Sequence, residues 1–265
     1  MKKADYKNWV PKSMVVGLTA ATAVSGILFA LFGVSRRFLQ GTPRKLCAAV
    51  FGLAAPVLLF YTVWMGALHR TFDYNGKRRL AKTIIDGTAD FVHIPDGGTG
   101  LDVGCGSGAL TIAAARRNPG AQMVGCDIWS GAYKAIFSKK RCQDNALAEG
   151  VHNVRFTEGN AVHLPFPDES FDAVTSNYVY HNIAGQDKQQ LLLETLRVLK
   201  KGGSFAIHDL MSKARYGDMN AFADRLRAEG YKEVRLIDTT DGRFMGRREA
   251  AWLGLGGSTL LVGRK

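Results

Sequence analysis

The fold is decided by one stretch, Thr99-Gly100-Leu101-Asp102-Val103-Gly104-Cys105-Gly106-Ser107-Gly108-Ala109-Leu110. A short apolar run leads into a turn with glycine at every second position, and residues 109–117 continue with helical periodicity. Glycines have no Cβ, so backbone N–H groups in the turn can approach a ligand closely. The positive N-terminal end of the helix faces the same place. The stretch therefore predicts a strand, a glycine-rich loop and a helix that bind a nucleotide-type ligand.

Two acidic residues flank this loop and narrow the chemistry of the ligand. Asp102 stands two residues before the first glycine, where a carboxylate would repel a pyrophosphate but suits a positively charged ligand. Asp127 ends the next apolar run, where an acidic side chain can accept hydrogen bonds from both ribose hydroxyls. S-adenosylmethionine (SAM) carries an ammonium group, a sulfonium and a ribose, but no phosphate. We therefore expect SAM as the ligand; the alternative is a structural glycine turn in an α/β domain.

From residue 73 to residue 265 the chain resembles the class I SAM-dependent methyltransferases. Residues 101–108 are similar to the first motif of that family, and Gly125-Cys126-Asp127 to its ribose-binding motif. Glu158-Gly159-Asn160-Ala161 stands where the family usually has Gly-Asp-Ala, the contact to the adenine edge, so an amide replaces the carboxylate here. Residues 164–174 and 196–203 match the runs that lead into the fourth and fifth strands of the family.

The resemblance implies a set of cofactor-binding residues. They are Asp102, Gly104, Cys105, Gly106, Gly108, Asp127, Ile128, Asn160, Ala161 and Asn177. The amide of Asn160 can still accept a hydrogen bond from the adenine amino group. Asn177 stands where the family often contacts the methionine end of SAM.

Apolar runs bounded by turn residues alternate with helix-period stretches in the same region. Strands are expected at residues 100–103, 122–126, 154–158, 171–176 and 204–208, with helices such as 132–149 and 188–199 between them. Such alternation predicts a parallel sheet covered by helices on both faces. Residues 233–237 and 258–262 read as two further strands, which in the family form an antiparallel hairpin at the sheet edge. We therefore expect an α/β, Rossmann-like, seven-stranded and mostly parallel sheet.

The beginning of the chain has a different character. Residues 14–34 and residues 46–68 carry no charge, and each span is long enough to cross a bilayer core of roughly 30 Å at about 1.5 Å per residue. We therefore expect a two-helix transmembrane hairpin in residues 1–70, followed by a methyltransferase domain in residues 71–265. A cleaved signal peptide and a buried soluble hairpin are the alternatives.

Small residues recur four apart in the first span, at Gly17 and Ala21 and at Gly26 and Ala30. This spacing lets two helices pack closely in lipid.

The charge of the chain is concentrated around the two spans. The formal net charge is +12, and residues 1–82 hold 13 Lys and Arg against two acidic residues. The remaining chain is close to neutral and shows no interleaved basic and aromatic face. Membrane lipids with anionic headgroups are therefore the expected partners, at roughly 1 kcal/mol for each basic residue near the surface, and nucleic acid is not.

The expected location is the membrane, with two spans and the catalytic domain facing the cytoplasm, where SAM is made. Nine basic residues lie outside the spans on the side of the two termini and four lie in the connecting loop, which favours cytoplasmic termini. A shallow hairpin that enters and leaves one leaflet would also keep these charges at one surface, and the sequence leaves both arrangements open.

The four cysteines, Cys47, Cys105, Cys126 and Cys142, are widely separated. They suggest neither a metal site nor a disulfide framework.

The methyl acceptor should lie above the carboxyl ends of the fourth and fifth strands. His181 follows the fourth strand and could act as a general base, because its unperturbed pKa lies near working pH. His208 with Asp209 is a second candidate. Alternatively, each histidine only shapes the pocket. Tyr178 and Tyr180 would provide an aromatic wall for an apolar acceptor or a cage for an amine.

The sequence thus predicts a membrane-anchored SAM-dependent methyltransferase that acts on a lipid or another apolar small molecule. A quinone precursor, an aminophospholipid headgroup and a hydrophobic thiol are the acceptors that fit. A tethered methyltransferase of a soluble metabolite and a non-catalytic SAM-binding membrane module are the alternatives. The oligomeric state stays open.

Overall fold

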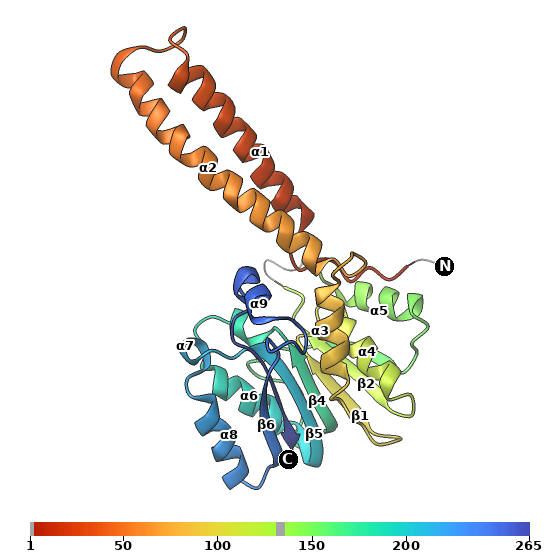
Figure 1. The fold of residues 1–265 in the computed structure, drawn as a ribbon. Helices are drawn as coiled ribbons and strands as arrows, with labels where there is room; N and C mark the ends of the chain where they lie inside the picture. Colours follow the sequence, from red (N-terminus) through yellow and green to blue (C-terminus); the bar gives the residue numbers. More distant parts are fainter. Residues whose placement is uncertain (1–2, 131–135) are drawn as a thin grey trace. The chain divides into compact units, whose positions relative to one another are not determined.

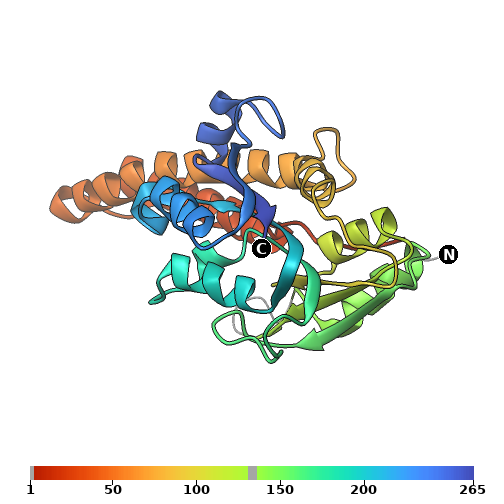
Figure 2. The same cartoon turned by 90° about the horizontal axis from the view of Figure 1, so that it is seen from below.

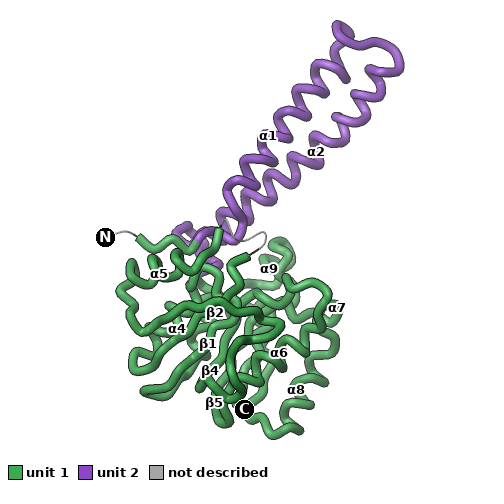
Figure 3. Tube along the Cα trace, turned by 180° about the vertical axis from the view of Figure 1, so that it is seen from behind, with its two compact units in different colours: residues 1–6, 82–265 green, residues 7–81 purple. Residues whose placement is uncertain are grey.

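The computed structural model describes residues 3–130 and 136–265, which form two compact units (Figure 3). One unit comprises residues 7–81, and the other comprises residues 3–6, 82–130 and 136–265. This division differs from the expected boundary at residue 70, because the first described residues pack with the larger unit and the smaller unit extends to residue 81.

The larger unit contains a seven-stranded sheet with the order β3-β2-β1-β4-β5-β7-β6. The strands are β1 (Thr99–Val103), β2 (Gln122–Asp127), β3 (Val154–Glu158), β4 (Phe171–Asn177), β5 (Leu199–Leu210), β6 (Lys232–Asp238) and β7 (Ser258–Arg264). The first five strands are parallel, whereas β7 runs antiparallel to both β5 and β6. The expected Rossmann-like, mostly parallel sheet is therefore confirmed.

Helices connect these strands and cover the sheet (Figures 1 and 2). They are α3 (Leu80–Ala89), α4 (Ala109–Arg117), α5 (Lys139–Ala148), η3 (Tyr180–Asn182), α6 (Lys188–Arg197), α7 (Lys213–Tyr216), α8 (Met219–Ala228) and α9 (Arg247–Leu253). Helix α6 ends two residues earlier than expected, because residue 199 already pairs with β4. The expected helix at 132–149 falls partly on residues 132–135, which lie outside the described residues, and α5 begins at Lys139 after its cap Ser138.

Alternate residues of β1 face opposite layers of the unit. Asp102 points to α4, where it accepts a hydrogen bond from Thr111. Its neighbours Leu101 and Val103 belong to the hydrophobic core that includes Leu192 of α6 and Phe222 of α8. This period of two is what a strand buried on both faces requires. The sheet therefore separates a layer containing α4 from a layer containing α6 and α8.

The strand order places a topological switch between β1 and β4. Strands β2 and β3 lie on one side of β1, while β4 and β5 lie on the other. In open α/β sheets, ligands bind outside the carboxyl ends of the strands at such a point. A ligand site is therefore expected among the residues that follow β1, β2, β4 and β5.

The smaller unit is a pair of long apolar helices. Helix α1 (Lys12–Leu28) continues as the π-helical turn η1 (Phe29–Val34), and α2 (Gly41–Phe72) contains Pro56. By length and composition, residues 12–34 and 41–72 could each cross a membrane. Only 6% of the most apolar stretch of the first helix and 0% of that of the second are buried.

The two helices approach each other closely at Gly33 and Gly52. A Cβ added to Gly33 would lie 2.8 Å from the Cα of Ala48, and one added to Gly52 would meet the ring of Phe29 at 3.0 Å. By contrast, a Cβ at Gly17 or Gly26 would have nothing within 4 Å. The close approach of these two helices therefore lies at Gly33 and Gly52 and not at Gly17 or Gly26. The four-residue spacing marks one face of the helix, but it does not show that this face meets the partner.

We predict that Gly33→Leu destabilises the helix pair and that Gly26→Leu does not. The leucine at position 33 must displace backbone atoms of α2, and such overpacking costs about 1–3 kcal/mol. Thermal unfolding of both full-length variants in detergent, followed by circular dichroism, measures the difference. Equal melting temperatures for the two variants would contradict this packing.

Candidate functional site

The glycine-rich loop after β1 is held in shape by its backbone. Gly104, Gly106 and Gly108 have φ angles of 72°, 55° and 81°, a region that residues with side chains rarely adopt. The N–H groups of Gly104 and Cys105 both donate to the carbonyl of Cys126, at 2.7 and 3.1 Å. A Cβ at Gly104 would lie 2.4 Å from the side chain of Val179. The loop is therefore fixed between the ends of β2 and β4.

Asp127 ties the end of β2 to the same loop. Its carboxylate accepts hydrogen bonds from the N–H of Gly106 at 2.9 Å and from the N–H of Trp129 at 2.8 Å. The indole N–H of Trp129 donates to the carbonyl of Gly106 at 3.0 Å. The backbone of Trp129 is left-handed, with φ of 38°. Sequence reasoning missed Trp129. Its position two residues after Asp127 of the ribose-binding motif was the available signal.

The surface beside Asp127 is open and partly apolar. Ile128 is 52% exposed, and the Asp127 carboxyl group is half-buried. The nearest atoms to a Cβ at Gly106 would belong to the ring of Phe137, at an ordinary 3.7 Å. An exposed apolar side chain beside a carboxylate offers contacts to the base and the ribose of an adenosine group. The residues present therefore fit the nucleoside part of SAM.

Asn160 follows β3 and is exposed. Its side-chain oxygen already accepts a hydrogen bond from the N–H of Val162 at 2.9 Å. The oxygen keeps a second lone pair for the adenine amino group, and the NH₂ of Asn160 can donate to a ring nitrogen of adenine. Ala161 is buried in the core, with 8% of its surface exposed.

Asp102 and Cys105 lie beneath the loop instead of on its surface. Asp102 is 1% exposed and bonds to the Thr111 hydroxyl at 2.6 Å. Burial raises the pKa of its carboxyl group to about 7. Burial also raises the pKa of the Cys105 thiol well above its usual value, so the thiol stays protonated. These two residues shape the loop from below.

His181 and Asp209 form a pair at the carboxyl ends of β4 and β5. The Nδ1 of His181 lies 2.5 Å from a carboxylate oxygen of Asp209, and the His181 N–H donates to the other oxygen at 3.2 Å. Asp209 is fully buried, while the His181 side chain is 18% exposed. Burial alone would raise the pKa of Asp209, but hydrogen bonds to its carboxylate, first the one with His181, outweigh burial and hold the pKa below its usual value. With Nδ1 bonded to Asp209, Nε2 of His181 is the nitrogen that can accept a proton.

His208 has a different environment from His181. It is fully buried, and its two ring nitrogens are hydrogen-bonded to Asn177 at 2.8 Å and to Thr239 at 2.9 Å. Burial lowers the pKa of His208 to about 3, so the ring is neutral. Asp209, which the sequence paired with His208, bonds to His181 instead. The structure therefore makes His208 a support for Asn177 and leaves His181 as the candidate base.

Only one of the two expected wall tyrosines is near the surface. Tyr178 is partly buried, with its ring 5.9 Å from that of His181, and its hydroxyl hydrogen-bonds to Ser258 at 2.6 Å. Its backbone is left-handed, with φ of 54°, and such unusual conformations cluster at functional sites. Tyr180 is fully buried and hydrogen-bonds to Thr195, so the expectation that it lines an acceptor site is wrong.

Comparison with known proteins gives the class. The family described as "Methyltransferase domain" matches residues 101–207. The demethylmenaquinone methyltransferase of Geobacillus stearothermophilus is 30% identical over 171 residues, covering 60% of this chain and 70% of that protein. The enzyme of the same name from Listeria welshimeri is 31% identical over 175 residues, covering 62% of this chain and 71% of that protein.

Solved structures share the fold. The [4+2]-cyclase SpnF aligns with a TM-score of 0.53 and 22% identity over 73% of this chain and 85% of that one. A geranyl diphosphate methyltransferase in complex with geranyl diphosphate (GPP) and sinefungin aligns with a TM-score of 0.52 and 16% identity over 72% and 85%. These likenesses concern the fold alone. Together with the sequence relatives, they confirm the resemblance: this chain belongs to the class I SAM-dependent methyltransferase family. It is therefore a methyltransferase whose methyl donor is SAM.

We predict that titration of Asp102 lowers the free energy of unfolding as the pH rises. Its pKa is about 7 when folded, against an ordinary 3.8, so the folded chain holds this proton more tightly than the unfolded chain. The free energy of unfolding should therefore decrease between about pH 4 and pH 7, by at most about 4 kcal/mol at about 1.4 kcal/mol per pH unit.

Asp102→Asn keeps an acceptor for Thr111 and should remove this dependence. The variant should gain stability over the wild type as the pH rises from about 4 to about 7. Urea denaturation of both full chains in detergent at a series of pH values measures the difference. Parallel curves for the two proteins would show that Asp102 does not titrate in this way.

Proposed function

We propose that this methyltransferase transfers a methyl group to a ring carbon of a membrane-dissolved quinol. The observation that carries the proposal is the His181–Asp209 pair, which presents one imidazole nitrogen at the carboxyl ends of β4 and β5. The relatives named demethylmenaquinone methyltransferase support a quinone-type acceptor.

A base fits this reaction because of how a quinol reacts. A quinone ring is electron-poor, but its reduced form, the quinol, becomes a carbon nucleophile when one hydroxyl loses its proton. SAM supplies an electrophilic methyl group and leaves as S-adenosylhomocysteine. In the proposed reaction, Nε2 of His181 accepts the hydroxyl proton and Asp209 stabilises the resulting imidazolium. Loss of the ring hydrogen at the methylated carbon then restores the aromatic ring, so one methyl replaces one hydrogen.

For the cofactor, we propose contacts along the four strand ends. The carboxylate of Asp127 would accept the ribose hydroxyls, and Ile128 would cover one face of the adenine. The NH₂ of Asn160 would donate to an adenine ring nitrogen. Asn177, held by His208, would meet the methionine end. Asp102 would support the shape of the loop from beneath and would not reach its surface, since its carboxyl group is buried.

We also propose that the helix pair anchors the enzyme in the membrane. Apolar side chains on both helices point outward, including Val24 at 55% and Leu53 at 72% exposure. A contiguous exposed apolar surface of this kind is costly in water and is stable in hydrocarbon. The basic residues that flank the spans would bind anionic headgroups and favour a cytoplasmic catalytic domain. Such an anchor would keep the enzyme where a quinol with an apolar tail dissolves.

We predict that His181→Gln lowers kcat for a reduced demethylnaphthoquinone acceptor by about 10²- to 10⁴-fold, the usual contribution of a positioned base. The affinity for SAM should not change, because His181 is not among the proposed cofactor contacts. Transfer of labelled methyl from SAM, with the acceptor kept reduced, measures the rate. His152→Gln, an exposed histidine before β3, is the matched control and should behave as the wild type.

Two outcomes would overturn the proposal. Full activity of His181→Gln would show that His181 is not the base. Equal methylation of the oxidised and reduced acceptor would show that the reaction does not require a quinol. Methylation of a soluble metabolite, with no activity on the quinol, would instead support the tethered-metabolite alternative.

We predict that the full chain stays in the membrane fraction after washing with alkaline carbonate or with high salt. Apolar burial is not screened by salt, whereas purely ionic binding is. The matched variant carries Val24→Arg and Leu53→Arg, each costing about 2.5–3.5 kcal/mol at the centre of a span, and should be released or degraded. Release of the wild type would rule out insertion.

A further inference from the structure

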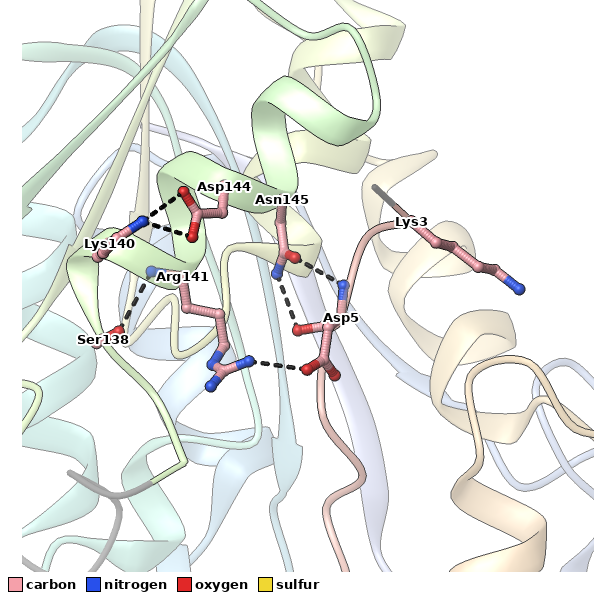
Figure 4. Close-up of a pocket in the computed structure, with 7 residues that line it drawn as sticks. All are labelled: Lys3, Asp5, Ser138, Lys140, Arg141, Asp144 and Asn145. Atoms are coloured by element: carbon pink, nitrogen blue, oxygen red, sulfur yellow. Dashed lines mark hydrogen bonds and ion pairs between the residues drawn. The ribbon is translucent and has the colours of Figure 1, made fainter. Parts of the chain in front are cut away.

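The described residues at the start of the chain pair with α5 of the catalytic unit. The N–H of Asp5 donates to the side-chain oxygen of Asn145 at 2.7 Å, and the NH₂ of Asn145 donates back to the Asp5 carbonyl at 3.2 Å (Figure 4). The next residue, Tyr6, is only 7% exposed. The amide of Asn145 thus pairs with the backbone of residue 5 as a neighbouring strand would.

The same amide reaches the glycine-rich loop. The NH₂ of Asn145 also donates to the carbonyl of Ser107 at 3.0 Å, and Ser107 lies between the second and third glycines. Asn145 is 2% exposed and Ser107 is 7% exposed, so water does not readily replace this bond. One buried side chain therefore joins residue 5 to the loop proposed to hold SAM.

Four charged side chains around this contact form two ion pairs. Arg141 pairs with the Asp5 carboxylate at 2.9 Å, and Lys140 pairs with Asp144 at 2.8 Å. Together with Lys3, Ser138 and Asn145, they line a cavity of about 210 Å³. Figure 4 shows Lys3 pointing away from the other side chains. This pairing favours closure of the N-terminal segment on α5 over recruitment of an anion.

We propose that residues 3–6 form a strap that holds the glycine-rich loop in its cofactor-binding shape, with Asn145 as the positioning residue. If the strap leaves, the buried amide of Asn145 loses two of its three bonds, and it must rotate or reach water to replace them. Ser107 then loses a fixed donor and the loop gains freedom. SAM binding must then order the loop again, which weakens affinity. The inference rests on the proposed cofactor role of the loop.

The test separates the backbone of residue 5 from its side chain. Asp5→Pro removes the N–H group that donates to the side-chain oxygen of Asn145. Asp5→Ala keeps that N–H group and removes the carboxylate that pairs with Arg141. Exposed ion pairs contribute little, so Asp5→Ala is the matched control. In the full chain, Asp5→Pro should raise the dissociation constant and KM for SAM about fivefold, while kcat at saturating SAM stays unchanged.

Further variants make the outcome decisive. Asn145→Asp keeps the acceptor for the Asp5 N–H but loses both donated bonds, and should weaken SAM binding at least as much. In an Asn145→Ala background, Asp5→Pro should have no further effect. Equal SAM affinity of Asp5→Pro and Asp5→Ala would overturn the strap. Gly106→Val tests the cofactor site itself. If this variant binds SAM normally, the proposed cofactor site is wrong. If Gly106→Val weakens SAM binding but Asp5→Pro does not, the cofactor site stands and only the strap is wrong.

Discussion

The rest of the site depends on the hydrogen bonds that the carboxylate of Asp127 accepts. This carboxylate binds the N–H groups of Gly106 and Trp129, so the end of β2 and the glycine-rich loop after β1 become one rigid element. A carboxylate has about four acceptor positions, and these two bonds leave room for ribose hydroxyls. The group that shapes the loop is thus also suited to hold the ligand, and binding needs little further ordering.

The loop in turn connects the cofactor side of the sheet to the acceptor side. Gly104 packs against Val179, and His181 follows two residues later in the same turn. The adjacent strand β5 supplies Asp209 to orient His181, and His208 to hold Asn177. A shift of the first glycine would therefore move the turn that carries the proposed base. The parallel register of β1, β4 and β5 is what brings these residues to one edge.

Local patterns predicted the sheet well because strands buried on both faces leave long apolar runs between turns. The same patterns failed where three-dimensional neighbours decide. Tyr180 and His208 stand at strand ends like Tyr178 and His181, and only the packing shows that the first two face inward. In the helix pair, Gly26 has the same spacing signal as other small residues, yet Gly33 meets the second helix.

Contacts between distant parts of the chain were out of reach of sequence reasoning. Asp5 and Asn145 are 140 residues apart, and neither lies in a recognisable motif. Trp129 is closer to a motif, but its hydrogen bond to Gly106 depends on an unusual backbone angle. Side chains that support a loop from behind have no preferred residue type, so a pattern of types cannot mark them.

Calorimetric titration of SAM into the wild-type chain and into Asp127→Ala tests most directly whether this loop is the cofactor site. If the carboxylate both shapes the loop and accepts the ribose, its loss should weaken binding by at least about 1.5–3 kcal/mol, or more than tenfold. Asp127→Asn, which keeps an acceptor oxygen, should fall between the two. Unchanged affinity in Asp127→Ala would place the cofactor elsewhere and contradict the account.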